Sequence, residues 1–102
     1  MKELRSHFAK LQDYEAFIAV VDAGNFTGAA ARLGRSQQSI SRSLIALEVR
    51  VGVVLIRRFT CTIQPTEAGL AFQRRLKEAF REIALAEAEL SDIASSHARR
   101  QE

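Results

Sequence analysis

Apolar residues recur at helical spacing in three stretches of the chain, with polar residues at the positions between them. The first stretch covers residues 10–23 and ends at Gly24, a residue type that readily adopts the left-handed conformation found after helices. Its apolar positions are Leu11, Tyr14, Phe17, Ile18 and Val21. This pattern predicts an amphipathic helix that contributes to a core, and residues 1–10 either extend this helix or fray.

The second stretch, residues 27–52, predicts two helices joined at Gly34. Asn25 or Thr27 can cap the first helix, and the four small residues that follow Thr27 allow it to pack closely. Ser36 can cap the second helix with its hydroxyl. The apolar stripe of the second helix consists of Ile40, Leu44, Leu47 and Val51. Two helices around so short a turn form the outline of a helix-turn-helix.

The polar side of this second helix, about residues 37–50, carries side chains suited to reading DNA. Gln38 and Arg42 lie one turn apart on the side opposite the apolar stripe, with Ser39 and Ser41 beside them. An amide and a guanidinium can each pair with the donor and acceptor groups that bases present in the major groove. We therefore predict a recognition helix here; the alternative is a solvated polar face.

A small β-hairpin is predicted after the recognition helix. Residues 53–58 begin with a short β-branched run, and residues 62–64 form the return strand. Pro65 cannot donate a ladder hydrogen bond and marks the end of the hairpin. The tip, residues 59–61, lacks the glycine, asparagine or aspartate of tight two-residue turns, so a looser connection is expected. We call residues 53–65 the wing.

The third helical stretch runs from Glu67 to about Ser95 without a proline, and Thr66 can cap it. At about 1.5 Å per residue it predicts a rod of roughly 40 Å, longer than so small a domain can cover. Alternating four-residue and three-residue steps give a coiled-coil seam of Phe72, Leu76, Ala79, Ile83, Ala86, Leu90 and Ile93. We expect the first turns to pack on the domain and the seam from Leu76 to Ile93 to form a homodimer interface; a solvated distal half is the alternative.

The positive charge of the chain is concentrated in one segment. Residues 32–65 contain six arginines against one carboxylate, a formal charge of +5, whereas the segments before and after it each carry −1. A localised basic patch attracts polyanions, and arginine suits bidentate hydrogen bonding to phosphate or guanine. The clustering therefore favours a nucleic-acid partner over a merely solvated surface.

Composition argues against several other classes of protein. Cys61 is the only cysteine, so no intramolecular disulfide forms and the composition suits a reducing interior. No apolar run approaches the roughly 18 residues of a membrane span, and the amino terminus lacks the apolar segment of a secretory signal. A soluble cytoplasmic protein is expected. The two histidines, His7 and His97, lie in the terminal segments, so we expect no nucleophile–base pair, no metal, no cofactor and no enzyme activity.

Many of these positions occur in register in one known family. From about Leu11 to Leu90 the chain resembles the amino-terminal DNA-binding domain of LysR-type transcriptional regulators. The resemblance is carried by Phe17, Val20, Gly24, Phe26, Ala29, Ala30, Leu33, Ser36, Gln37, Ser41, Leu47, Glu48, Gly52, Leu55, Arg58, Thr66, Ala68 and Gly69. It implies a mainly α fold, a winged helix-turn-helix of three helices and a two-stranded wing, followed by a long linker helix that pairs in a homodimer.

The resemblance also implies a partner, double-stranded DNA with an imperfect inverted repeat, and a set of contacts. Gln37, Gln38, Ser41 and Arg42 are implied at the bases, and Ser36 and Ser39 near phosphates. The family often carries arginine where this chain has Cys61, and Arg57 is the substitute; Arg58 either contacts DNA or pairs with Glu48. The full predicted DNA-binding set is Arg35, Ser36, Gln37, Gln38, Ser39, Ser41, Arg42, Arg57 and Arg58. Ile45 and Val49 are aliphatic residues on the outward side of the recognition helix and have no assigned role. Three explanations remain open: methyl contact with thymine, contact with a partner, and simple tolerance of an aliphatic side chain at an exposed position.

The predicted organisation is an amino-terminal extension (1–10), a winged helix-turn-helix (11–65), a linker helix (66–96) and a flexible tail (97–102). LysR-type regulators continue into an effector-binding domain, which is absent here, so we expect no small-molecule effector in this chain. Either a shortened version of a longer regulator or a stand-alone short regulator fits. We predict a sequence-specific DNA-binding transcriptional regulator; the alternative is a module that dimerises with a full-length relative and blocks it.

Overall fold

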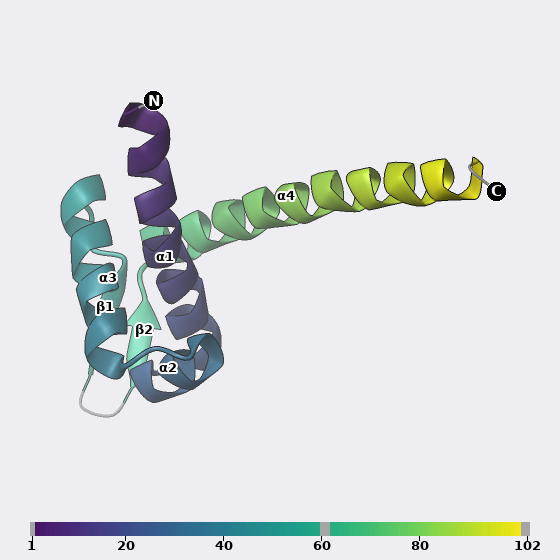
Figure 1. Cartoon of the computed structure of the whole chain (residues 1–102). Helices are drawn as coiled ribbons and strands as arrows, with labels where there is room; N and C mark the ends of the chain where they lie inside the picture. Colours follow the sequence, from purple (N-terminus) through teal and green to yellow (C-terminus); the bar gives the residue numbers. More distant parts are fainter. Residues whose placement is uncertain (1, 60–61, 101–102) are drawn as a thin grey trace.

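The computed structural model describes the backbone of residues 2–59 and 62–100 and the side chains of residues 11–59 and 62–97. Its elements, in order, are α1 (Lys2–Ala23), α2 (Phe26–Leu33), α3 (Gln37–Val51), β1 (Ile56–Arg58), β2 (Ile63–Pro65) and α4 (Glu67–Arg100). The first three helices and the hairpin form one body, from which α4 projects as a rod (Figure 1). The predicted mainly α winged helix-turn-helix with a long carboxy-terminal helix is confirmed.

Some element boundaries differ from the prediction. α1 begins at Lys2, so residues 2–10 extend the first helix, and α4 continues to Arg100, so the segment predicted to fray from residue 97 is helical. β1 begins at Ile56 rather than at residue 53, because the return strand β2 offers only three partners, with Ile56 opposite Pro65. The predicted loose turn falls on residues 60 and 61, which lie outside the described residues.

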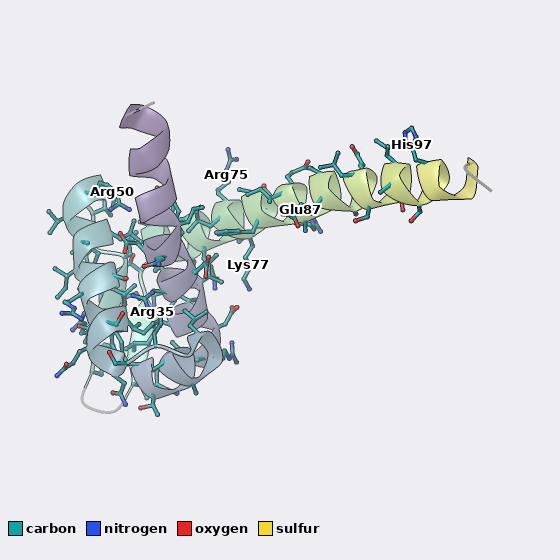
Figure 2. The ribbon with its side chains drawn as sticks, viewed as in Figure 1. Arg35, Arg50, Arg75, Lys77, Glu87 and His97 are labelled. Atoms are coloured by element: carbon teal, nitrogen blue, oxygen red, sulfur yellow. The ribbon has the colours of Figure 1, made fainter. Side chains whose placement is uncertain are left out.

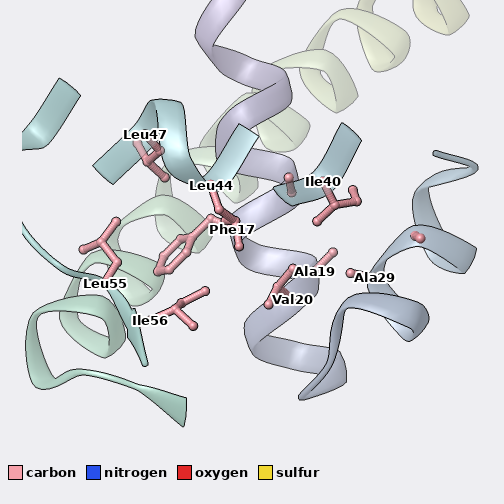
Figure 3. Close-up of a cluster of buried hydrophobic side chains, with 11 residues drawn as sticks. Phe17, Ala19, Val20, Ala29, Ile40, Leu44, Leu47, Leu55 and Ile56 are labelled. Atoms are coloured by element: carbon pink, nitrogen blue, oxygen red, sulfur yellow. The ribbon is translucent and has the colours of Figure 1, made fainter. Parts of the chain in front are cut away.

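The core lies where α1, α2, α3 and the wing meet. Its largest fully buried side chains are Phe17, Val20, Ile40 and Leu47 (Figure 3). Burying such side chains stabilises the fold by roughly 1.5–3 kcal/mol each. The predicted stripe of α3 was wrong at one position. Val51 is 41% exposed, because it lies in the last turn of α3, where the chain turns away towards β1.

Local chemistry ends and begins the helices as predicted. The Asn25 carboxamide oxygen accepts from the Gly28 N–H at 2.6 Å, so Asn25 rather than Thr27 caps α2. The Ser36 hydroxyl accepts from the Ser39 N–H at 3.1 Å and caps α3. Between the two helices Gly34 has a φ of 63°, a conformation that side chains with a Cβ rarely adopt. This turn fixes where α3 begins relative to α2.

Hydrogen bonds between side chains and backbone groups join the wing to α3 and α4. The Glu48 carboxylate accepts from the N–H groups of Leu55 at 2.7 Å and Ile56 at 3.2 Å, which fixes the start of the wing on α3. The Thr66 hydroxyl caps α4 by accepting from the Gly69 N–H at 3.0 Å, and it donates to the Val54 carbonyl at 2.8 Å. The wing therefore has fixed ends on both sides of the hairpin.

A polar joint connects α4 to α1. Gln73, only 7% exposed, donates to the Asp22 carboxylate at 2.9 Å, and Lys77 pairs with the same carboxylate at 2.8 Å. Phe72 and Leu76 pack against the core, as predicted for the first turns. Beyond this joint every described side chain of α4 from residue 81 to residue 97 is exposed. The distal half of the rod is thus uncovered by its own domain.

Candidate nucleic-acid interface

The outward side of α3 is a continuous exposed stripe. Because Ile40, Leu44 and Leu47 fill the inward positions, helical periodicity directs Gln38, Arg42, Ile45 and Val49 away from the core. Gln38 and Arg42 are exposed near the amino-terminal half, and Ile45 and Val49 are 51% and 77% exposed further along. The stripe therefore offers hydrogen-bonding groups at one end and aliphatic surface at the other.

A hollow of about 230 Å³ separates the wing from the amino-terminal ends of α2 and α3. The Gln37 amide nitrogen donates to the Thr27 hydroxyl at 3.1 Å on one side, and the wing contributes Arg58, Phe59 and Thr62 on the other. The helix N-termini supply partial positive charge beside a guanidinium, a combination that favours anions. The recognition stripe and the wing thus flank one polar depression.

Not all six arginines of the basic segment contribute to this face. The Arg50 guanidinium pairs with the Asp13 carboxylate at 3.1 Å and lies 5.6 Å from the centre of the Tyr14 ring. Arg32 lines a different hollow, of about 390 Å³, between α1, α2 and α4, together with Lys77. These two charges are therefore directed away from the recognition stripe.

Arg58 lies over an aromatic ring rather than beside Glu48. Its guanidinium carbon is 4.9 Å from the centre of the Phe26 ring, within the range of a cation–π contact. Among the described side chains, no ion pair joins Arg58 to Glu48, whose Oε2 accepts from the two backbone amides at the start of the wing. Of the two predicted roles for Arg58, pairing with Glu48 is not seen in the described part of the chain. Arg58 is exposed beside the hollow, where DNA could reach it, but its guanidinium lies over the Phe26 ring.

Arg35 points inward, between α1 and α3, as Figure 2 shows. Its side chain donates to Ser39, to Ser43 and to the Gln12 carbonyl at distances of 2.7–3.1 Å. Arg35 and Ser39 are half-buried, whereas Ser36, an exposed residue, is used as a helix cap. The arrangement separates Arg35 and Ser39 from the exposed members of the predicted DNA-binding set.

The remaining predicted residues lie on α3 and on the wing. Gln37, Gln38, Arg42, Arg57 and Arg58 are exposed, and Ser41 is half-buried between them and the core side of α3. The hollow, to which Thr27, Phe59 and Thr62 contribute, was not predicted from the sequence. Thr27 was considered only as a cap, and its position in the first turn of α2 was the signal that pointed to a second role.

The predicted dimer positions on α4 differ in exposure. Leu76 is partly buried against its own domain, since this turn of α4 still lies against α1. Ala79 and Ala86 are exposed, and Ile83, Leu90 and Ile93 are 52%, 66% and 54% exposed. Leu85, outside the predicted seam, is also 52% exposed. The uncovered part of the seam therefore begins at Ala79.

The described residues contain neither a cluster suited to a metal ion nor a helix suited to a membrane span. In the part of the chain that the structure describes, no three or more histidine, cysteine or acidic side chains gather as they would around a metal ion. No helix within the described ranges combines the length and apolarity that crossing a bilayer requires. Cys61, the single cysteine of the sequence, lies outside the described residues.

Known structures share this arrangement. The chain superposes on the BenM DBD in its complex with catB site 1 DNA with a TM-score of 0.78 and 28% identity, covering 83% of this chain and 96% of that one. It superposes on the CbnR DBD of a CbnR DBD–DNA complex with a TM-score of 0.72 and 39% identity, covering 82% and 95%. Both likenesses include most of the solved DNA-binding domain.

Sequence relatives are regulators, which confirms the prediction that the chain is not an enzyme. The HTH-type transcriptional regulator PgrR of Escherichia coli (strain K12) is 37% identical over 84 residues, which is 82% of this chain and 28% of PgrR. The chain thus spans about a quarter of the length of the curated relatives it matches. Residues 11–70 match the model of the bacterial regulatory helix-turn-helix protein, lysR family, and this is more than half of the sequence. The chain therefore belongs to the lysR family of bacterial regulatory helix-turn-helix proteins.

Proposed function

We propose that the chain is a sequence-specific DNA-binding module of a transcriptional regulator, and that α3 reads bases in the major groove. The observation that carries this proposal is the exposed stripe with Gln38 and Arg42 beside the wing hollow. An α-helix fits the major groove, and amide and guanidinium groups match the edges of adenine and guanine. The BenM and CbnR DBD structures are both DNA complexes, and the likeness of this chain to them supports the same partner.

Two kinds of contact divide the surface. Gln37, Gln38, Ser41 and Arg42 are the proposed base-reading residues, because they lie along the outward side and the first turns of α3. The proposed phosphate contacts are Ser36, Arg57 and Arg58, at the start of α3 and on the wing. Contacts of the second kind position a protein on the duplex without reading its sequence.

A homodimer through α4 completes the proposal. The exposed Ile83, Leu90 and Ile93 share one side of a helix that its own domain leaves uncovered. Such a stripe is stabilised when a second copy covers it, and two linked modules then bind two half-sites of an inverted repeat. The alternative role of blocking a full-length relative would use the same stripe but would need neither Arg42 nor the wing.

The charges of α4 favour an antiparallel pair. Residues 74–81 carry four basic side chains and one acidic, and residues 82–92 carry four acidic side chains and none basic. An antiparallel arrangement brings the basic segment of one copy beside the acidic segment of the other, whereas a parallel one aligns like charges. This orientation also separates the two recognition helices by the length of the rods.

Selection from a randomised duplex pool at a stated salt concentration tests the proposed function. We expect enrichment of an imperfect inverted repeat whose half-site spacing is fixed by the rod. Size-exclusion chromatography with light scattering, with and without the selected duplex, then reports whether the chain is a dimer. Recovery of sequences no different from the input pool would contradict base reading and favour the blocking role.

A further inference from the structure

We propose that Arg35 is a positioning residue of the recognition helix and not a contact to DNA. Its guanidinium fixes the first two turns of α3 against the middle of α1. The inference rests on the proposed reading role of α3 and names a residue that controls the accuracy of that reading. This role differs from the DNA contact that was predicted for Arg35 from the sequence.

The contacts of Arg35 reach two successive turns of α3. Its Nε donates to the Ser39 hydroxyl at 2.9 Å, and one terminal nitrogen donates to the same hydroxyl at 2.7 Å and to the Ser39 carbonyl at 3.0 Å. That nitrogen also lies 2.7 Å from the Ser43 hydroxyl. The other terminal nitrogen donates to the Gln12 carbonyl on α1 at 3.1 Å. One planar group therefore ties residues 39 and 43 of α3 to residue 12 of α1.

These contacts use most of the hydrogen-bonding capacity of Arg35. An arginine side chain has five N–H donors, and here each of its three nitrogens already has an acceptor. Ser43 is 7% exposed, and the removal of its charged donor would leave a buried hydroxyl without this partner. A phosphate would therefore have to displace internal acceptors rather than meet a free guanidinium.

The position of these contacts explains why they matter for reading. Ser39 and Ser43 occupy the same turns of α3 as the exposed Gln38 and Arg42, but on the inward side. Side chains that recognise bases must be held to within about 0.5 Å of the productive geometry. Loosening Arg35 lets these turns move, so the hydrogen bonds to bases weaken while phosphate contacts on the wing are unaffected.

A second arginine fixes the other end of α3 to the neighbouring residue of α1. Arg50, in the last turn, pairs with the Asp13 carboxylate at 3.1 Å, directly after the Gln12 that accepts from Arg35. The two guanidinium groups thus approach one site on α1 from opposite ends of the recognition helix. The orientation of α3 relative to α1 is therefore set by these two side chains as well as by packing in the core.

Three variants separate positioning from phosphate contact. Arg35→Met removes every donor, Arg35→Lys keeps the positive charge but cannot span three acceptors, and Ser43→Ala removes an acceptor that is buried and out of reach of DNA. Binding of each variant is measured on a duplex enriched from the randomised pool and on a scrambled duplex, over a range of salt concentrations. Arg57→Ala serves as the control for an exposed arginine.

A positioning role for Arg35 predicts a specific pattern of affinities among these variants. Arg35→Met and Arg35→Lys should both lower the ratio of affinities for the enriched and scrambled duplexes by roughly tenfold or more, the size expected for charged hydrogen bonds. The slope of log affinity against log salt should stay unchanged. Ser43→Ala should shift the ratio in the same direction and add little to Arg35→Met. An Arg35→Lys variant with full affinity, or an Arg35→Met variant with a slope reduced by about 0.9, would overturn the inference in favour of a phosphate contact.

Hydrogen exchange in the free chain gives a readout that does not depend on DNA. Arg35→Met should speed exchange of the backbone amides of residues 40–44 by about tenfold, with amides of α4 as the internal reference. Unchanged exchange there would overturn the inference even if affinity falls. If the parent chain shows no preference among duplexes, the proposed function fails, and the exchange result alone still decides whether Arg35 holds α3.

Discussion

Arg42 and Arg35 belong to the same basic segment, yet their guanidinium groups face different surroundings. Arg42 is exposed on the outward side of α3, whereas Arg35 is half-buried and bonded to Ser39, Ser43 and α1. They lie seven positions apart in the sequence, and the cap of α3, Ser36, lies between them. The same residue type therefore acts by recognition in one place and by positioning in the other.

Replacement of Arg42 tests the reading role directly. We expect Arg42→Ala to cost about 1–3 kcal/mol on the enriched duplex and to relax the preference at one base position, because a bidentate base contact is lost. Equilibrium titrations on duplexes altered at single positions measure both effects. Equal affinities of parent and variant on the enriched duplex would contradict the assignment.

Arg57 tests the phosphate role at the wing. It is exposed on β1, opposite Gln64, and none of the hydrogen bonds found among the described side chains uses its guanidinium. Arg57→Ala should weaken enriched and scrambled duplexes alike and reduce the salt slope by about one. A loss confined to the enriched duplex would instead assign Arg57 to base reading.

At the scale of elements, the junction between the wing and α4 depends on one close approach. A Cβ built on Gly69 would lie 2.1 Å from the Leu55 carbonyl oxygen, a backbone atom that cannot move away easily. The Thr66 hydroxyl accepts from the Gly69 N–H in the same turn. Glycine here therefore lets α4 begin directly against the chain that enters the wing.

Gly69→Ala should consequently destabilise the domain, although alanine usually favours helices. We expect a loss of about 1–3 kcal/mol in the free energy of unfolding, since α4 or the wing must shift to admit the methyl group. Ser91→Ala, at an exposed position of the same helix, is the matched control and should be neutral or slightly stabilising. Urea unfolding of both variants measures the difference; a Gly69→Ala variant as stable as the parent would show that the junction adapts.

Features that depend on neighbouring residues could be predicted from the sequence, whereas features that depend on residues far apart in the chain could not. The Ser36 cap, the Gly34 turn and the long helix α4 follow from neighbours within a few positions. The inward turn of Arg35 depends on the Gln12 carbonyl, 23 residues away, and on how α1 crosses α3. The position of Leu76 likewise depends on packing between α4 and α1. For the candidate site, residue types and the outward face were predictable, but the internal use of arginines was not.

At the scale of the whole molecule, α4 makes the chain far longer than its body, with a greatest extent of 61 Å. The joint of Gln73, Lys77 and Asp22 fixes the direction in which the rod leaves, and its distal side chains are uncovered. Two copies paired along these rods would carry their recognition helices at a defined separation. The spacing between half-sites is then set by the length of α4 and by the joint that fixes its direction.

Two equally exposed residues test this pairing. Ile83 lies on the seam and Leu85 lies on the other side of α4, and both are 52% exposed. Ile83→Ser should weaken the dimer strongly, because each copy loses about 1.5–3 kcal/mol of burial, whereas Leu85→Ser should leave it unchanged. Sedimentation equilibrium measures both. Equal effects of the two substitutions would contradict the proposed seam.

Base reading by α3 is tested by comparing the affinity of the parent chain for its enriched duplex with that for a scrambled duplex of equal length and composition, across salt concentrations. If α3 reads bases, both affinities should fall as salt rises and the enriched duplex should stay preferred, by about a thousandfold or more at physiological salt. Equal affinities for the two duplexes at every salt concentration would contradict the claim that α3 reads DNA sequence.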